Sequence, residues 1–226
     1  MTTPKTVAIM QPYFFPYAGY FRLFAVADIF VVLDCVQFPR RGWVHRNQLP
    51  DNEGNLQWLT LPLIKGPRNE TRICDLKFQQ ALKESFQDEW RRYPTLVAID
   101  KTFPALGREI RNFDQSPVEY LMNTLQIVTN LLGMTRPIIR SSELQIPEEL
   151  RAQCRIIEIA RRIGAKHYIN APGGRNLYEA QGFEEAGITL NFLPNYSGPF
   201  SSILQRLAEE KPGNIAAEVL RNLPIL

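Results

Sequence analysis

The chain has 226 residues, of which 45% are apolar and 22% are charged, and its formal net charge is +3. These values are typical of a packed globular protein, and so mild a charge argues against a nucleic acid as the partner. Three scattered cysteines argue against a disulfide framework. No apolar run approaches about 18 residues and the start MTTPKTVAIM lacks an apolar signal core, so we expect a cytoplasmic protein without a membrane span.

The N-terminal part of the chain predicts a βαβ unit. Thr6–Gln11 reads as a short buried strand that Pro12 ends, and a helix can form over Gly19–Ala27. Ile29–Asp34 reads as a second buried strand. Because both strands are continuously apolar rather than alternating, they favour a parallel sheet.

The middle of the chain predicts two strands and then a group of helices. Gln57–Leu63 and Thr71–Phe78 read as strands that could pair as a hairpin, and a turn signal at 50–55 precedes the first. Apolar residues at helical spacing then predict three helices, Leu82–Arg92, Phe103–Arg111 and Val118–Leu132. We interpret residues 80–133 as a helical insert.

The remaining sequence returns to alternating strands and helices. The expected strands are Arg136–Arg140, Lys166–Ile169 and Ile188–Leu193, and the expected helices are Pro147–Ile163, Ser201–Glu209 and Ile215–Asn222. No linker is long enough to separate two domains. The sequence therefore predicts a single α/β domain over residues 1–226, with a Rossmann-like, mostly parallel sheet flanked by helices.

The loop QPYFFPYAG follows the first strand, where open parallel sheets bind their ligands. We expect Gln11, Tyr17 and Tyr20 to line such a site, because their polar tips need partners if they are buried. The alternative is that the aromatic side chains of this loop belong to the core and that the prolines only shape it.

The same loop can be aligned with the pattern G-x-F-D-P-x-H-x-G-H of nucleotidyltransferases related to the class I synthetases. The proline and the glycine fit, but Phe15, Ala18 and Tyr20 replace the acid and both histidines. Those histidines contact phosphates in that chemistry, so the sequence indicates a shared shape rather than a shared reaction.

A second group of candidate residues lies in DCVQFPRRGWVHRNQL, directly after the second strand. A carboxylate beside several guanidiniums can bind a zwitterion, a sugar phosphate or a carboxylate. We predict that Asp34 or His45 acts as a base and that Arg46 assists catalysis. Substrate-binding residues are expected at Arg41, Trp43 and Asn47. The alternative is a solvated loop held by internal salt bridges.

A third group follows later strands. In KHYINAPGGRNLY, Gly173 and Gly174 would let the backbone approach a ligand or make a tight turn. Ser142 closes another strand and could bind a ligand or cap the next segment. His167 lies in a buried strand and reads as structural. No cysteine pair has zinc spacing, so we expect no metal site, and the sequence indicates no particular cofactor.

Several of these segments resemble the WbqC-like proteins, a family found among bacterial genes for O-antigen and other surface polysaccharides such as lipopolysaccharide. The resemblance is carried by QPYFFPYAGYF, by D-x-V-Q-F, by RGWVHRN, by WLTLPL, by SSEL and by YINAPGGRNLY, and so extends over almost the whole chain. Members often carry a second acid at the position of Cys35. The resemblance implies a transferase that moves glycine or another amino-acid group onto a sugar.

Our leading hypothesis is accordingly an aminoacyl-type transferase that acts on a sugar or nucleotide sugar. Arg41, Arg46 and Asn47 would bind the anionic donor or the oxyanion, and Gln11 and the loop tyrosines would form the acceptor wall. Two alternatives stay open, namely a nucleotide-dependent enzyme that adenylates a carboxylate and a non-catalytic ligand-binding protein of a polysaccharide assembly.

Overall fold

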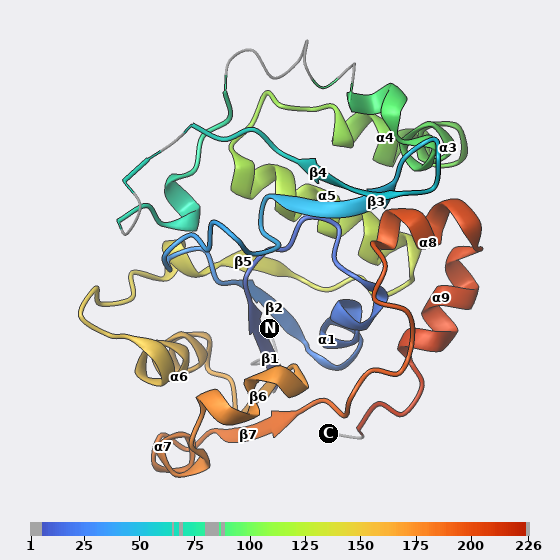
Figure 1. Ribbon diagram of the computed structural model, residues 1–226. Helices are drawn as coiled ribbons and strands as arrows, with labels where there is room; N and C mark the ends of the chain where they lie inside the picture. The colour runs from blue at the N-terminus through green and yellow to red at the C-terminus, as the bar shows by residue number, and fades with distance from the viewer. Residues whose placement is uncertain (1–5, 65, 68–69, 80–85, 87–88, 225–226) are drawn as a thin grey trace.

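The computed structural model of the chain describes residues 6–64, 66–67, 70–79, 86 and 89–224 (Figure 1). Its strands, in chain order, are β1 (Thr6–Met10), β2 (Ile29–Val32), β3 (Arg46–Pro50), β4 (Leu56–Thr60), β5 (Ile138–Arg140), β6 (His167–Asn170) and β7 (Thr189–Phe192). The helices are α1 (Arg22–Val26), α3 (Pro94–Thr102), α4 (Pro104–Ile110), α5 (Pro117–Leu131), α6 (Ala152–Ile163), α7 (Ala180–Glu185), α8 (Ile203–Glu209) and α9 (Pro212–Val219). Short 3-10 helices form at η1 (Ala18–Phe21), η2 (Ile73–Asp75), η3 (Ser141–Leu144) and η4 (Pro172–Leu177).

A parallel sheet of five strands in the order β5-β2-β1-β6-β7 organises the described residues. Numbered within the sheet, this is the order 3-2-1-4-5 of doubly wound nucleotide-binding sheets. The sequence-based fold class, an α/β protein with a Rossmann-like parallel sheet flanked by helices, is therefore confirmed. The first βαβ unit is confirmed as well, because β1 pairs with β2 in parallel, from Val7 opposite Ile29 to Met10 opposite Val32.

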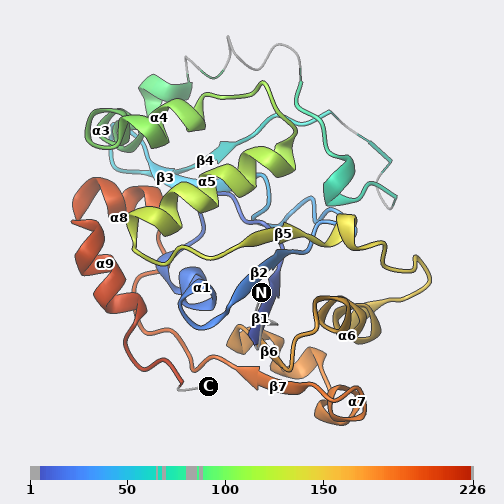
Figure 2. The ribbon, with the colours of Figure 1, turned by 180° about the vertical axis from the view of Figure 1, so that it is seen from behind.

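The sheet lies between two hydrophobic clusters, because alternate residues of its strands face opposite sides. Val7 and Ile9 of β1 pack in the smaller cluster with residues of α6 and α7. Ala8 packs in the larger cluster with residues of α1, α3, α4, α5, α8 and α9. Figure 2 shows the same division, with α6 and α7 beside β6 and β7 and with α5 over the opposite part of the molecule.

Helix α5 starts at a capping box. The Ser116 hydroxyl accepts the Glu119 amide hydrogen at 3.2 Å, and the Glu119 carboxylate accepts the Ser116 amide hydrogen at 2.9 Å. Pro117 occupies the first helical position, where its missing N–H has no cost. The strong start expected for this helix from its Ser-Pro sequence is therefore confirmed, one residue earlier than expected.

The prediction of a strand over Thr71–Phe78 is wrong. Ile73–Asp75 forms the 3-10 helix η2, which the Arg72–Asp75 ion pair at 2.9 Å closes, and Phe78 makes only an isolated bridge with Leu63. The partner of β4 in the hairpin is β3, a segment for which we predicted no strand. Its sequence RNQLP has no β-branched or aromatic residue, so local preference gave no strand signal.

Other boundaries also differ from expectation. Helix α6 starts at Ala152 rather than at 147, because the Arg155 guanidinium fixes the preceding turn through the carbonyl oxygens of Glu148 and Leu150. Helices α3 and α7 were not expected. Of the expected helix Leu82–Arg92, residues 86 and 89–92 are described and are helical, and the rest lies outside the described residues. Within the described part of the chain, no helix is long and apolar enough to cross a membrane.

Candidate ligand site at the carboxyl edge of the sheet

The strand order places a topological switch point between β1 and β6, which pair in parallel at the centre of the sheet. On either side of this point the connections leave toward opposite faces, so the carboxyl ends of the two strands border a crevice in such folds. The loop 11–17 leaves β1 here, and η4 follows β6. This edge is therefore the candidate ligand site.

The loop after β1 is held in one strained shape. Phe15 has a φ of 47°, a left-handed conformation that bulky residues rarely adopt. Its carbonyl oxygen accepts hydrogen bonds from the Asn47 side-chain amide at 2.5 Å and from the Ser202 hydroxyl at 3.0 Å. Asn47 also donates to the Phe14 carbonyl oxygen at 2.9 Å. Strain of this kind persists only where surrounding structure imposes it, and it concentrates at functional sites.

The structure places the predicted loop residues in three different environments. Tyr20 is 4% exposed, and its hydroxyl donates to the Gln11 carbonyl oxygen at 2.8 Å. Tyr17 is half-buried against Phe200 and Tyr196, with ring centroids 4.8 and 5.5 Å away. Gln11 is partly exposed. Tyr20 thus has a packing role here, and its contact with a ligand stays a prediction, whereas Gln11 and Tyr17 keep accessible surface.

Asp34 lies at the same edge as Gln11, as the sequence predicted, because β1 and β2 run in parallel and in register. Its carboxylate is fully buried and accepts four hydrogen bonds, from the Arg140 Nε at 2.9 Å, the Ser141 hydroxyl at 3.0 Å, and the amide and hydroxyl of Ser142 at 2.8 and 2.7 Å. These donors occupy both oxygens of the carboxylate and fix its orientation. The geometry therefore favours a positioning role, and the predicted base role stays a prediction.

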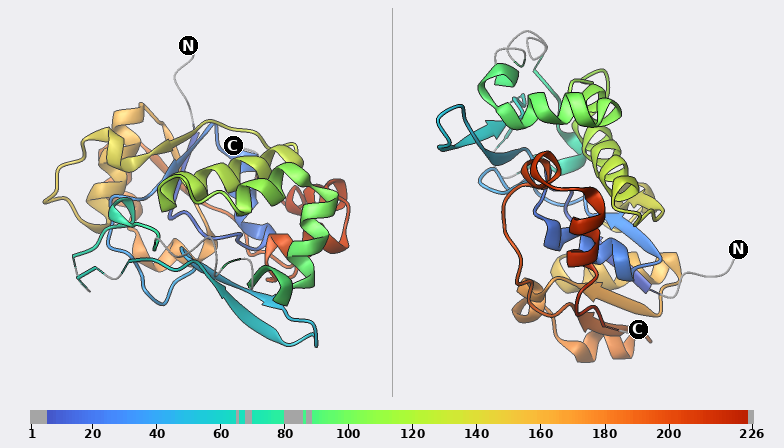
Figure 3. Two further views of the ribbon diagram at one scale, coloured as in Figure 1. Left: turned by 90° about the horizontal axis from the view of Figure 1, so that it is seen from above. Right: turned by 90° about the vertical axis from the view of Figure 1, so that its right-hand side faces the viewer.

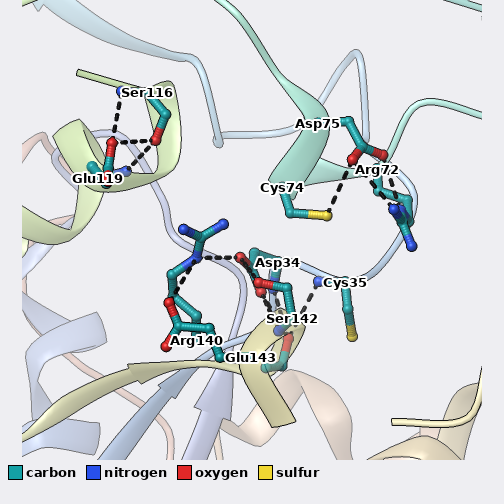
Figure 4. Close-up of polar contacts among 11 residues, drawn as sticks. Asp34, Cys35, Arg72, Cys74, Asp75, Ser116, Glu119, Arg140, Ser142 and Glu143 are labelled. Carbon is teal, nitrogen blue, oxygen red and sulfur yellow. Dashed lines mark hydrogen bonds and ion pairs between the residues drawn. The ribbon is translucent and has the colours of Figure 1, made fainter. Parts of the chain in front are cut away.

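Arg140 is the residue at this edge that sequence reasoning missed. Burial alone would lower the pKa of its guanidinium, but the hydrogen bond to Asp34 and the Asp34 charge raise it. Figure 4 shows its Nε joined to Asp34, and its two terminal nitrogens have no hydrogen-bond partner among the described residues. Two free NH2 groups in a fixed fork suit a carboxylate or phosphate. The signal was its place at the end of an expected strand, directly before Ser141.

His45 and Cys74 are both neutral at pH 7. Burial and the neighbouring Arg46 charge lower the pKa of His45 to about 4, and its Nδ1 is buried without a partner in the described part of the chain. Burial and the Asp75 carboxylate raise the pKa of the Cys74 thiol to about 11. His45 is thus a weak proton acceptor, and Cys74 is not an activated nucleophile.

The remaining predicted residues separate into two groups. Arg41, Trp43 and Arg46 lie at the start of the β3–β4 hairpin and face outward, and Asn47 turns inward to the β1 loop. Gly174 is buried against Asn170, whose side-chain nitrogen would lie 2.4 Å from a Cβ at that position. Gly173 is exposed, with open space where a Cβ would be. The structure thus brings Gly173 and Gly174 to the switch point and places the arginine group beside it.

Ser142 is brought to Asp34, as described above, rather than capping a helix. Among the described residues, no group of three or more His, Cys, Asp or Glu side chains is placed to hold a metal ion. The arrangement can bind an anion through Arg140 and can bring backbone N–H groups to a ligand at η4. Three strand spacings separate β5 from β6, about 14 Å, so an elongated ligand could reach both ends.

We predict that Asp34→Asn lowers the free energy of unfolding by about 3 kcal/mol, because it leaves the partly buried Arg140 guanidinium without its countercharge and turns an amide group toward donors. Urea denaturation measures the change. Glu143→Gln is the matched control, since Glu143 also pairs with this guanidinium, at 3.9 Å, but its carboxylate is exposed. We expect this variant to lose less than about 1 kcal/mol, and equal losses for the two variants would contradict the positioning role of Asp34.

We also predict that the protein loses stability as the pH falls from about 6.5 to about 4. The folded-state pKa of His45 lies below its unfolded value, so the unfolded chain binds a proton first and the free energy of unfolding falls with pH. His45→Gln should reduce this acid sensitivity, and His167→Gln, at the other histidine, is the control. Thermal denaturation across this pH range measures it, and an unchanged profile for His45→Gln would refute the assignment.

Comparisons with known proteins identify the chain's relatives. The family model described as "WbqC-like protein family" matches residues 11–202, from the start of the β1 loop to the Ser202 that holds it. A Mycobacterium tuberculosis protein with the printed name "Uncharacterized protein Rv1507c" is 25% identical over 207 residues, covering 86% of this chain and 84% of the relative. No solved structure matches the chain. Because the family model spans most of its length, the chain belongs to the WbqC-like protein family.

Proposed function

We propose that the protein is a transferase that moves glycine or another aminoacyl group onto a sugar or nucleotide sugar in surface polysaccharide synthesis. The observation that carries the proposal is the switch point between β1 and β6. Two loops that lie within the region matched by the family model border this point. Ligands of doubly wound sheets bind at this place. The transferase activity itself comes from the family resemblance described above.

The groups at this edge suit the binding of an anionic donor and a polar acceptor. The free terminal nitrogens of Arg140 would hold a carboxylate or phosphate, and Asp34 would keep that guanidinium in place. Gly173 and Gly174 would let the main chain approach the ligand. His45 would accept the proton of the attacking group as a neutral imidazole, although its low pKa makes it a weak base.

A nucleotide-dependent reaction is the second candidate. The strand order 3-2-1-4-5 favours it, because that order is typical of sheets that bind nucleotides at the switch point. In this case a nucleotide would activate the carboxylate before transfer. The two candidates differ in the small molecule that the protein would bind, which is a sugar or nucleotide sugar in the first and a nucleotide in the second.

The experiment that tests the site is a thermal-shift series with ATP, a uridine diphosphate sugar and glycine. A ligand at 100 times its Kd stabilises a protein by about 2.7 kcal/mol. We predict that Gly173→Leu melts close to the unmodified protein, because its side chain meets open space, but loses the ligand-induced shift. A ten-fold or greater weakening of binding is the expected result.

Gly213→Leu is the matched control, since Gly213 is also exposed with open space around its Cβ position but lies in α9. It should bind as tightly as the unmodified protein. A shift with the uridine diphosphate sugar supports transfer to a nucleotide sugar, and a shift with ATP alone supports the second candidate. Silence from all three probes, or full binding by Gly173→Leu, would remove the proposed site.

A further inference from the structure

Two tryptophans and an arginine form an exposed surface on the β3–β4 hairpin, which we call the Trp–Arg platform (Trp43, Arg46 and Trp58). The Trp43 and Trp58 rings lie with centroids 5.4 Å apart, and the Arg46 guanidinium lies 4.2 Å from the centroid of Trp58. The two tryptophans are 43% and 41% exposed. Both views of Figure 3 show this hairpin at the periphery of the molecule.

The side chains of the platform lie on the outer face of the hairpin and do not belong to the core. In β4 the burial alternates, so that Leu59 faces inward and is 1% exposed, whereas Trp58 and Thr60 face outward. Arg46 and Gln48 of β3 stand opposite Thr60 and Trp58 in the antiparallel register. The outer face of the hairpin therefore carries its largest apolar side chain among polar groups. Contiguous exposed aromatic surface of this kind marks interaction sites.

The charges beside the platform are of one sign and uncompensated. Arg40, Arg41 and Arg46 lie within seven positions, and none of them pairs with a carboxylate in the part of the chain that the structure describes. Arg46 is instead held by the carbonyl oxygens of Gly42 at 3.3 Å and Arg41 at 2.7 Å. These bonds fix its orientation without neutralising its charge. Charge complementarity therefore favours an anionic occupant over a neutral one.

The platform is joined to the candidate site through the main chain. The Trp43 carbonyl oxygen accepts the Phe14 amide hydrogen at 2.8 Å, and Asn47 donates to Phe14 and Phe15. The hairpin that carries the platform thus also holds the loop at the switch point. A ligand bound to the platform would therefore lie beside the candidate site.

We propose that the Trp–Arg platform binds an acidic saccharide chain, as the docking surface for the acceptor of the proposed transfer. This inference rests on the proposed function. The C–H face of a pyranose ring can stack on an indole, and guanidiniums bind the carboxylates of uronic acids in a bidentate manner. A nucleic acid fits less well, because the formal net charge of +3 lacks the strongly basic balance that is typical of nucleic-acid-binding proteins.

Binding of a hexamer of galacturonic acid, followed by calorimetry with the intact chain, tests the proposal. Maltohexaose serves as the neutral saccharide and a thymidine hexanucleotide as the nucleic acid. We expect the galacturonate to bind most tightly and its affinity to fall with salt. Trp58→Ala and Arg41→Glu should each weaken it ten-fold or more. Leu56→Ala is the control, because Leu56 is 60% exposed on the same face of the hairpin but lies outside the platform. This variant should bind the galacturonate as tightly as the unmodified protein.

Arg41→Glu and Trp43→Ala keep the test decisive if Trp58→Ala fails to fold, since both residues are exposed. Tighter binding of the thymidine hexamer, equal binding of maltohexaose, or unchanged binding by the folded variants would overturn the proposal. Trp58→Ala should keep the thermal shift that ATP or glycine induces and that Gly173→Leu loses, because neither probe carries a saccharide. Failure of the platform and failure of the proposed function are thereby distinguished.

Discussion

The carbonyl oxygen of Phe15 is the point on which the carboxyl edge of this protein depends. It accepts hydrogen bonds from Asn47, 32 residues away, and from Ser202, 187 residues away. A left-handed conformation at an aromatic residue costs about 1–3 kcal/mol, and two buried hydrogen bonds of about 0.5–1.5 kcal/mol each can offset it. The shape of the β1 loop is therefore imposed by distant parts of the chain, and it joins the sheet, the hairpin and the C-terminal helices.

A second polar contact organises the neighbouring strands at the same edge. Asp34 follows β2, and its four donors come from the end of β5 and from η3, so that one buried carboxylate fixes both strand ends (Figure 4). Such a saturated carboxylate holds the groups that donate to it in fixed positions. It leaves the outer nitrogens of Arg140 available, and the chemistry of the site would then come from Arg140, the η4 backbone and the ligand itself.

Much of the sheet could be predicted from the sequence, because buried parallel strands such as Ile29–Val32 are short apolar runs bounded by turn residues. The shared edge of Gln11 and Asp34 followed from that pattern. The hairpin strand β3 could not be predicted, since RNQLP becomes a strand only through pairing with β4 and through the inward contacts of Asn47 and Leu49. Pairing of this kind is a tertiary effect that outweighs weak local preference.

The side-chain roles were harder to predict than the strands. Nothing local distinguishes Tyr20, whose hydroxyl bonds the main chain in the core, from Tyr17, which stays partly exposed. Arg140 gains its role only because β5 pairs with β2, and that neighbour relation is not written in either segment. The outward direction of Arg46 likewise depends on the register of the hairpin, which sequence spacing alone did not give.

The most direct test of this account is a double-mutant cycle between Asn47→Ala and Ser202→Ala, with free energies of unfolding measured in urea. Because both side chains donate to the same carbonyl oxygen, we expect their effects to be coupled by about 0.5 kcal/mol or more. Asn47→Ala with Ser116→Ala at the start of α5 is the control pair, and its effects should add. Additive effects for Asn47 and Ser202 would contradict the claim that the Phe15 carbonyl oxygen holds this edge together.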